Sequence, residues 1–212
     1  MGWNAVRRRP GGGSPVQGGG VRLALVVLLA IVAVMAAVGW MARPQLPDGV
    51  DRWLNPVAYE EEIAAAAERQ RLDRHLVMAV VKAESSFQKD AVSKVGAVGL
   101  MQLMPETAEW IAGRADWAGP ESPQLDNPEE NLALGCYYLR FLLDMYHGDT
   151  VAALAAYNAG QGVVDGWLGE LGITPGGSDK LDPASIPFPD TRDFVRRVLS
   201  VRDLYARIYP QS

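Results

Sequence analysis

The stretch AESSFQKDAVSKVGAVGLMQLMP, residues 83–105, is the part of the sequence around which we expect the fold to be organised. Its one glutamate, Glu84, follows an apolar run, LVMAVV, over residues 76–81. A run of this kind with no Gly or Pro predicts a buried helix that ends near Glu84. The negative end of the helix dipole and the apolar surroundings both disfavour the ionised carboxylate. We therefore expect the pKa of Glu84 to be raised towards neutrality.

A simpler interpretation of the same residues is open at this point. Glu84 can be a surface residue, and Ser85 and Ser86 can be serines that cap a following helix. Glu-Ser-Ser by itself does not separate the two interpretations, so the segments on either side have to decide between them.

The sequence from residue 58 onward predicts an all-α domain. Apolar residues recur at helical spacing, caps and prolines mark the starts of helices, and no alternation typical of strands is present. Loops are expected at residues 117–127 and 169–188, and Asp73 is the expected cap of the helix that carries Glu84. The expected helices are Tyr59–Arg71, His75–Ser85, Pro105–Arg114, Pro128–Tyr146, Thr150–Tyr157, Gly162–Leu168 and Thr191–Tyr209.

Composition limits the classes of function. With 212 residues, of which 49% are hydrophobic, the chain can bury one core. The single cysteine, Cys136, excludes a disulfide within the chain and a cysteine-rich metal cluster, and we expect a buried thiol. His75 and His147 lack the partners of a metal site and are expected at the surface or at helix ends. We expect no metal and no cofactor.

Charge is distributed unevenly along the chain. The only charged residues before Pro44 are five arginines, which leaves 15 basic against 25 acidic residues in the remainder. An acidic domain without a basic stripe argues against nucleic acid as a partner.

The N-terminal region predicts a membrane anchor. Residues 23–42 carry no charge, and about 20 apolar residues are enough to cross the hydrocarbon core of a bilayer. The basic tail of residues 1–22 should stay in the cytoplasm by the positive-inside rule, so a linker of residues 43–57 and a domain of residues 58–212 would lie outside. A cleaved signal peptide is the alternative, and it exports the domain equally.

Three sequence blocks occur in an order that resembles a known family. They are ESSFQKDAVSKVGAVGLMQLMPETA (84–108), AAYNAGQG (155–162) and IPFPDTRDFVRRVL (186–199). Together they resemble the soluble-lytic-transglycosylase (SLT) domain, which belongs to family 23 of the glycoside hydrolases and has a lysozyme-like fold of the goose type. The resemblance extends from about residue 59 to residue 209.

The resemblance implies an enzyme of peptidoglycan turnover. Members of the family cleave the β-1,4 bond between N-acetylmuramic acid and N-acetylglucosamine without water and leave a 1,6-anhydromuramyl end. Glu84 matches the single catalytic acid and base of the family. The positions that match substrate-binding residues are Ser93, Gln102, Met104, Tyr157 and Asn158.

The chemistry of the residues agrees with this activity. Most glycosidases need two carboxylates, whereas a substrate-assisted enzyme needs one because the acetamido group of the sugar supports the positive centre. Glu84 would first protonate the leaving oxygen and then accept the proton of the C6 hydroxyl as the anhydro ring closes. Such an acid has to start protonated near neutral pH, which the apolar helix before Glu84 favours.

Each supporting residue also has a purely structural interpretation. Ser93 can cap a turn, Tyr157 can be a core phenol, and Asn158 can cap a helix. Met104 can fill the core, although we expect Gln102 to point away from it. These roles are therefore predicted by the resemblance, and the residue types alone do not establish them.

The last block departs from the family pattern at two positions. Asp190 stands where glutamate is common, so a carboxylate that could support the site is one methylene shorter. Phe194 stands where tyrosine is common, which removes a hydroxyl. Two other functions stay open: a muramidase that cleaves the same bond with water, and a peptidoglycan-binding module of an envelope assembly that has no activity.

Overall fold

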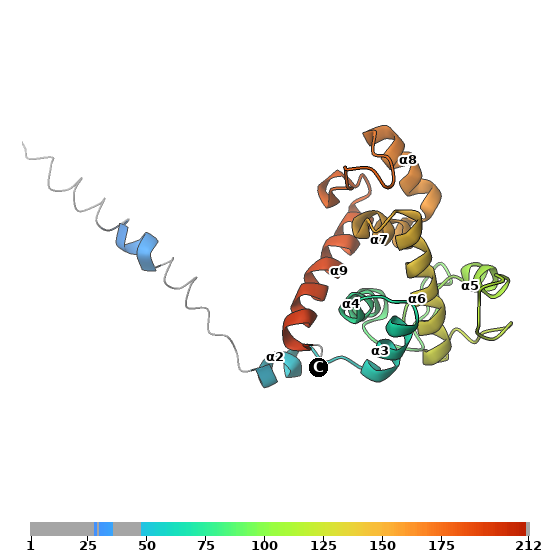
Figure 1. Ribbon diagram of the computed structural model, residues 1–212. Helices are drawn as coiled ribbons and strands as arrows, with labels where there is room; N and C mark the ends of the chain where they lie inside the picture. Colours follow the sequence, from blue (N-terminus) through green and yellow to red (C-terminus); the bar gives the residue numbers. More distant parts are fainter. Residues whose placement is uncertain (1–27, 29, 36–47, 211–212) are drawn as a thin grey trace, which may run out of the picture. The chain divides into compact units, whose positions relative to one another are not determined.

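The computed structural model describes residues 28, 30–35 and 48–210 (Figure 1). The chain divides into two compact units, residues 1–46 and residues 47–212. In the first unit, residues 28 and 30–35 are helical and exposed. The predicted tail of residues 1–22 and most of the predicted span of residues 23–42 lie outside the described residues. Within the described part of the chain, no helix combines the length and the hydropathy needed to cross a bilayer.

The second unit is built from helices, as the sequence predicts. Residues 48–210 contain no strand, and the only strand-like pairings are isolated bridges that join Val92 to Val98 and Val98 to Leu103. The helices are α2 (Asp48–Leu54), α3 (Glu60–Arg69), α4 (Arg74–Ser85), α5 (Pro105–Ala112), α6 (Pro128–Met145), α7 (Thr150–Ala159), α8 (Gln161–Leu171), the 3₁₀ turn η1 (Pro183–Ser185) and α9 (Pro189–Ile208).

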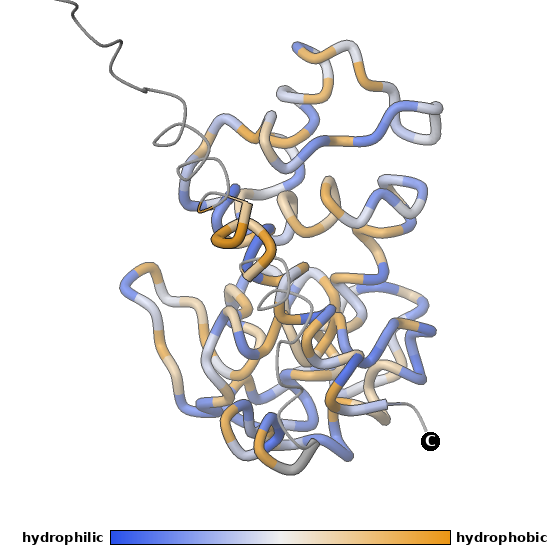
Figure 2. Tube along the Cα trace, turned by 90° about the vertical axis from the view of Figure 1, so that its left-hand side faces the viewer, coloured by the Kyte–Doolittle hydropathy of each residue, from blue (hydrophilic) through white to orange (hydrophobic). Residues whose placement is uncertain are grey.

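Helix α4 lies at the centre of this unit. Figure 1 shows it nearly end-on, with α3, α6, α7 and α9 around it. The run of residues 76–81 is at most 5% exposed, which confirms the predicted buried helix. Apolar and polar residues alternate along much of the tube in Figure 2, as expected for helices with one buried face. Burial of α4 on all sides explains why its apolar run has no polar interruption.

Side chains at the helix starts fix where the helices begin. Asp73 accepts a hydrogen bond from the backbone N–H of His75 at 2.9 Å, so the predicted cap of α4 is confirmed. Asn127 caps α6 in the same way. Asp149 caps α7, and its second carboxylate oxygen accepts a bond from the N–H of Leu181 at 2.8 Å. This last contact ties the loop after α8 to the core, because Leu181 is itself buried.

Helix α2 lies inside the segment that the sequence analysis assigns to a linker. It contacts the C-terminal end of α9, where Arg52 donates a hydrogen bond to the carbonyl of Ile208 at 2.7 Å. The Arg52 guanidinium also lies over the ring of Tyr209, 4.9 Å from its centroid, and the Tyr209 hydroxyl donates to the carbonyl of Asn55. Residues 48–55 therefore belong to the folded unit.

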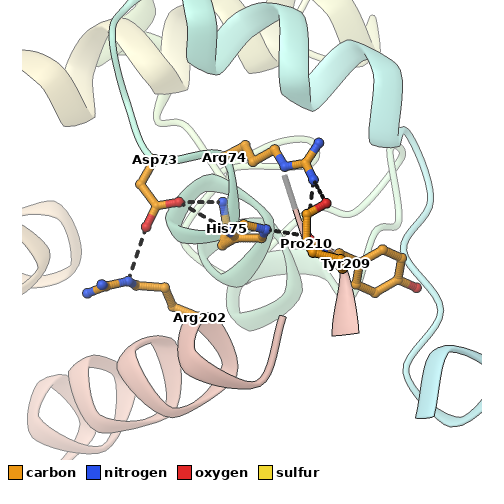
Figure 3. Close-up of polar contacts among 6 residues, drawn as sticks. All are labelled: Asp73, Arg74, His75, Arg202, Tyr209 and Pro210. Carbon is orange, nitrogen blue, oxygen red and sulfur yellow. Dashed lines mark hydrogen bonds and ion pairs between the residues drawn. The ribbon is translucent and has the colours of Figure 1, made fainter. Parts of the chain in front are cut away.

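The end of α9 is held on the start of α4 by a second group of polar contacts (Figure 3). His75 lies in the first turn of α4, which agrees with the expected surface or helix-end position, and it is only 5% exposed. Its Nε2 lies 2.6 Å from the carbonyl of Tyr209, which can only accept, so Nε2 carries the proton. Arg74 donates to the same carbonyl at 3.0 Å and to that of Pro210 at 2.7 Å. Arg202 pairs with Asp73 at 3.1 Å.

Replacement of His75 tests how much this contact contributes to stability. His75→Ala should lower the free energy of unfolding by about 1–3 kcal/mol, because it leaves a buried carbonyl with one donor fewer and opens a small cavity. Urea unfolding followed by circular dichroism measures the change. Arg207→Ala, an exposed change near the same end of α9, should stay within about 0.5 kcal/mol. Equal losses of unfolding free energy in the two variants would contradict a stabilising role of the contact between His75 and Tyr209.

Candidate active site

Glu84 lies in the last turn of α4, and its side chain is half-buried. Burial raises the pKa of Glu84 to about 7, and the positive charge of Arg197 on α9 acts in the opposite direction. The raised pKa expected from the sequence is confirmed, and loss of hydration is its main cause. Near neutral pH a substantial fraction of Glu84 therefore carries its proton.

Two features end α4 directly after Glu84. The hydroxyl of Ser85 donates to the carbonyls of Val81 at 3.2 Å and Leu100 at 2.8 Å, and the Ser85 side chain is buried. Ser86 takes the left-handed conformation, with a φ of 52°, and closes the helix. The interpretation of Ser85 and Ser86 as caps of a following helix is therefore wrong, because they end the helix that carries Glu84 and Ser85 joins it to the next loop.

The loop of residues 91–103 is held in a compact shape by its own polar groups. Ser93 Oγ accepts a bond from the N–H of Ala97 at 2.9 Å, and the backbones of these two residues pair as well. Gln102 has a φ of 48°, and its amide nitrogen donates to the carbonyls of Ala91 and Gly99, both at 3.0 Å. The side chains of Ser93 and Gln102 thus stabilise the loop, and any contact with a ligand would be an additional role.

Asn131 on α6 joins this loop to the helical core and is not among the residues predicted from the sequence. Its side chain is fully buried, accepts from the N–H of Met101 at 2.8 Å, and donates to the carbonyls of Val98 and Leu125, both at 2.9 Å. A Cβ on Gly99 would come within 2.2 Å of this amide, so only glycine fits there, at a φ of 84°. The available signal was a polar residue on the apolar face of a predicted helix.

Tyr157 on α7 also contacts this loop. Its hydroxyl donates to the carbonyl of Met101 at 2.8 Å, so the phenol is satisfied by the backbone. Burial and, secondarily, the charge of Glu84 raise the pKa of Tyr157 well above its ordinary value. The second cause places the phenol close to the Glu84 carboxyl. Tyr157 therefore contacts the 91–103 loop directly and senses the charge of Glu84.

The remaining predicted residues lie at the end of α7, at the start of α9 and at the start of α5. Asn158 is exposed at the end of α7, and its Oδ1 accepts a bond from the hydroxyl of Thr191 at 2.8 Å, which joins the AYNAG block to the start of α9. Asp190 is exposed in the first turn of α9, and Met104 is half-buried at the start of α5. Phe194 is 2% exposed within the core, so an apolar ring suits that position.

The arrangement supports proton transfer at one carboxyl group. Glu84 can donate a proton at neutral pH and accept one back, because its pKa lies close to that pH. Cys136 is fully buried, and burial raises the pKa of its thiol to about 12, so it is not a nucleophile. In the described part of the chain, no three His, Cys, Asp or Glu side chains are grouped so that they could hold a metal ion.

Comparison with known proteins agrees with the helical fold. The family model of the transglycosylase SLT domain matches residues 61–175, which is more than half of the chain. The chain belongs to the transglycosylase SLT domain family. The matched region includes Glu84, the 91–103 loop and Tyr157.

Individual relatives are similar over most of this chain. It is 34% identical over 159 residues to a soluble lytic murein transglycosylase of Escherichia coli, covering 73% of this chain and 24% of the relative. It is 29% identical over 168 residues to a membrane-bound lytic murein transglycosylase C of Edwardsiella ictaluri, covering 71% and 47%. The chain thus corresponds to about a quarter of the longer relative and half of the shorter one.

Solved structures are similar as well. An inactive Glu-to-Gln mutant of the lytic transglycosylase Slt from Pseudomonas aeruginosa is 31% identical, with a TM-score of 0.62, over 88% of this chain and 29% of that one. A complex of the 70-kDa soluble lytic transglycosylase with bulgecin A is 31% identical, with a TM-score of 0.67, over 76% and 26%. The lysozyme-like helical fold expected from the sequence is confirmed by these matches.

The raised pKa of Glu84 predicts a pH-dependent cost to stability. The folded-state pKa of about 7 lies above the ordinary value of 4.5, so the folded form binds the proton more tightly than the unfolded form. Stability should therefore fall as pH rises from about 4.5 to 7, by about 3 kcal/mol for this group. Glu84→Gln removes the charge, so it should be more stable than wild type at pH 8 and about equal at pH 4.5.

Denaturant unfolding of both proteins at the two pH values measures this difference. Glu170→Gln, an exposed change on α8, is the control and should show no comparable difference between the two pH values. A Glu84→Gln variant that gains nothing at pH 8 would contradict a buried, proton-holding carboxyl.

Proposed function

We propose that this protein is a peptidoglycan lytic transglycosylase that cleaves the β-1,4 bond between N-acetylmuramic acid and N-acetylglucosamine. The observation that carries the proposal is the half-buried Glu84 with a pKa of about 7, held at the end of α4 in a chain of the SLT family. Relatives named lytic murein transglycosylase support the substrate, because murein is peptidoglycan. The glycan strands of the cell wall are then the partner of the site.

The proposed reaction uses one carboxyl group twice. Protonated Glu84 gives its proton to the glycosidic oxygen, and the bond from that oxygen to C1 of the muramyl sugar breaks. The substrate's own acetamido group supports the positive centre at C1. The Glu84 carboxylate then takes the proton of the C6 hydroxyl while O6 bonds to C1, so Glu84 ends protonated and no water is consumed. A pKa near neutrality suits both steps.

The other predicted residues are proposed to bind and orient the glycan. Tyr157 and Asn158 lie on α7, and Met104 lies directly before the first turn of α5. Ser93 and Gln102 hold the loop, and we propose that they also contact the sugar. Asp190, exposed at the start of α9, is proposed to support the site through its helix, where a carboxylate is favourable in the first turn.

The activity is tested by the products of digested peptidoglycan. Wild-type protein should release muropeptides with 1,6-anhydromuramyl ends, and Glu84→Gln should lower the rate at least about 100-fold, because it removes the general acid and base. Mass spectrometry of the digest measures both. Circular dichroism shows whether the variant keeps its fold, and Glu170→Gln is the control with an unchanged rate.

Three outcomes would contradict parts of this proposal. Ends heavier by one water would show a hydrolytic muramidase. A Glu84→Gln variant that cleaves at the wild-type rate would show that the acid is misassigned. Binding of peptidoglycan with no cleavage by wild type would favour a module of an envelope assembly.

We further propose that residues 23–42 form a signal-anchor, with residues 1–22 in the cytoplasm and the domain on the outer side of the membrane. The support is the uncharged stretch, the arginines before it, and relatives that are named membrane-bound. The folded unit begins by residue 48, so residues 43–47 would connect the span to α2.

Membrane fractionation of the full chain tests the anchor. The intact chain should stay in the membrane fraction after a high-salt wash, and Val32→Arg should reduce this retention because a charge near the middle of a span is costly. Val50→Arg, outside the span, is the control. A mature chain that starts between Ala33 and Gln45, found by N-terminal sequencing, would show a cleaved signal peptide instead.

A further inference from the structure

Helix α2 carries its apolar side chains on the face that points away from the fold. Val50, Trp53 and Leu54 have the i, i+3 and i+4 spacing that places side chains on one face of a helix. Their exposed fractions are 38%, 78% and 55%. Arg52 lies on the opposite face, where it bonds to the carbonyl of Ile208 on α9. The polar side of α2 therefore contacts the domain and the apolar side points outward, which is the reverse of an ordinary surface helix.

The contacts of α2 with the end of α9 fix the direction of this apolar face. The Arg52 guanidinium lies over the ring of Tyr209, and the Tyr209 hydroxyl donates at 3.1 Å to the carbonyl of Asn55, directly after α2. Tyr209 is itself held on the start of α4, because its carbonyl accepts bonds from Arg74 and His75 (Figure 3). The exposed side chains of α2 are therefore attached to a well-bonded end of the domain.

The exposed face of α2 is too small to be the interface with a second protein. A stable protein–protein interface buries about 1,200 Å² or more of accessible surface in total. Three side chains on a helix of 7 residues supply only part of that area. A lipid surface needs less area when the same chain is already anchored in the bilayer, because the anchor gives a high effective concentration. Tryptophan is also enriched at the boundary between lipid headgroups and acyl chains.

The position of α2 in the chain would bring it close to a bilayer. The proposed span ends at residue 42 and α2 begins at Asp48, so only residues 43–47 connect them. A connection of this length reaches about 20 Å when it is fully extended. Whatever path the connection takes, the start of α2 would lie within that distance of the end of the span.

We propose that the apolar face of α2 inserts into the headgroup region of the membrane on its outer side and so fixes the orientation of the domain. The inference rests on the proposed signal-anchor and is independent of the proposed reaction. The span holds the chain in the membrane, and α2 only orients the domain. The rise of α4 from Arg74 to Glu84 is about 15 Å. Docking would therefore keep Glu84 near the membrane and bring glycan close to the membrane within its reach.

A spin label on the full chain in phosphatidylcholine vesicles tests this contact. Cys136 is buried, so Val50→Cys provides one accessible thiol for a nitroxide label on the apolar face of α2. The label should be more accessible to oxygen, which concentrates in lipid, than to a water-soluble nickel complex. The same label at Glu170→Cys, an exposed position on α8, is the control and should show the accessibility expected in water.

Two further changes show whether the apolar side chains cause the insertion. Adding Trp53→Ser and Leu54→Ser should remove the excess accessibility of the Val50 label to oxygen, because a polar face gains nothing from entering lipid. Adding Leu171→Ser, an exposed apolar change on α8, is the matched control and should leave the excess unchanged. Circular dichroism shows whether each variant keeps its fold, and Trp53→Ser alone should remove part of the excess.

The outcomes separate the docking of α2 from the other proposals. A Val50 label with the accessibility expected in water, on a chain that stays with the vesicles, would overturn the docking and leave the anchor and the proposed reaction intact. Spin–spin broadening that disappears on dilution in lipid would show a second copy of the chain on this face and would also overturn it. A chain that does not stay with the vesicles would overturn the anchor and the docking together, and cleavage of peptidoglycan would still be decided by its products.

Discussion

Loss of hydration at one carboxyl group is the constraint on which the site depends. An ionised carboxylate in apolar surroundings is unfavourable in free energy, so Glu84 keeps its proton to a higher pH than an exposed glutamate does. The residues around Glu84 have to be rigid, because water that entered would lower the pKa of Glu84 towards its ordinary value. The centre of the domain is rigid in this way, because the apolar run of α4 is buried on all sides and Ser85 bonds the C-terminal end of α4 to the carbonyl of Leu100.

The loop of residues 91–103 is held rigid by side chains rather than by regular secondary structure. Asn131, Gln102 and Tyr157 each bond to its backbone, and they come from α6, the loop itself and α7. A loop of this kind can be shaped to a ligand, whereas a helix has its backbone groups already paired. Groups that are already positioned before the reaction do not have to reorganise during it. This preorganisation is the main source of electrostatic stabilisation of a transition state.

Local sequence patterns predicted the helices and the position of Glu84 well. The apolar run of residues 76–81 and the capping residue Asp73 report short-range preferences that the fold preserves. Contacts between distant segments were not predictable in the same way. In the sequence Asn131 is an ordinary polar residue, and its role is evident only from its contacts with Gly99 and Met101. His75 is buried only because the end of α9 covers it. Helix α2 is too short to be recognised by periodicity, and its contacts with α9 hold it in place.

The roles of the predicted site residues also depend on contacts that the sequence does not show. The resemblance placed Ser93 and Gln102 in a binding role, and the structure shows that both have a structural task in the loop. The two roles are compatible, because a side chain held by the loop backbone is already oriented when a ligand arrives. Sequence motifs alone cannot separate these roles, since the same residue type at the same position satisfies either one.

The position of α9 affects the pKa of Glu84. Burial alone would raise the pKa further, and Arg197 lowers it again from the side of α9. An acid that has to give a proton and then take one back is most effective when its pKa lies near the working pH. Arg197 is exposed, so its pull is screened by solvent and stays the smaller of the two effects. The same helix reaches Asn158 through Thr191, so α9 lowers the pKa of the carboxyl group and also holds the end of α7.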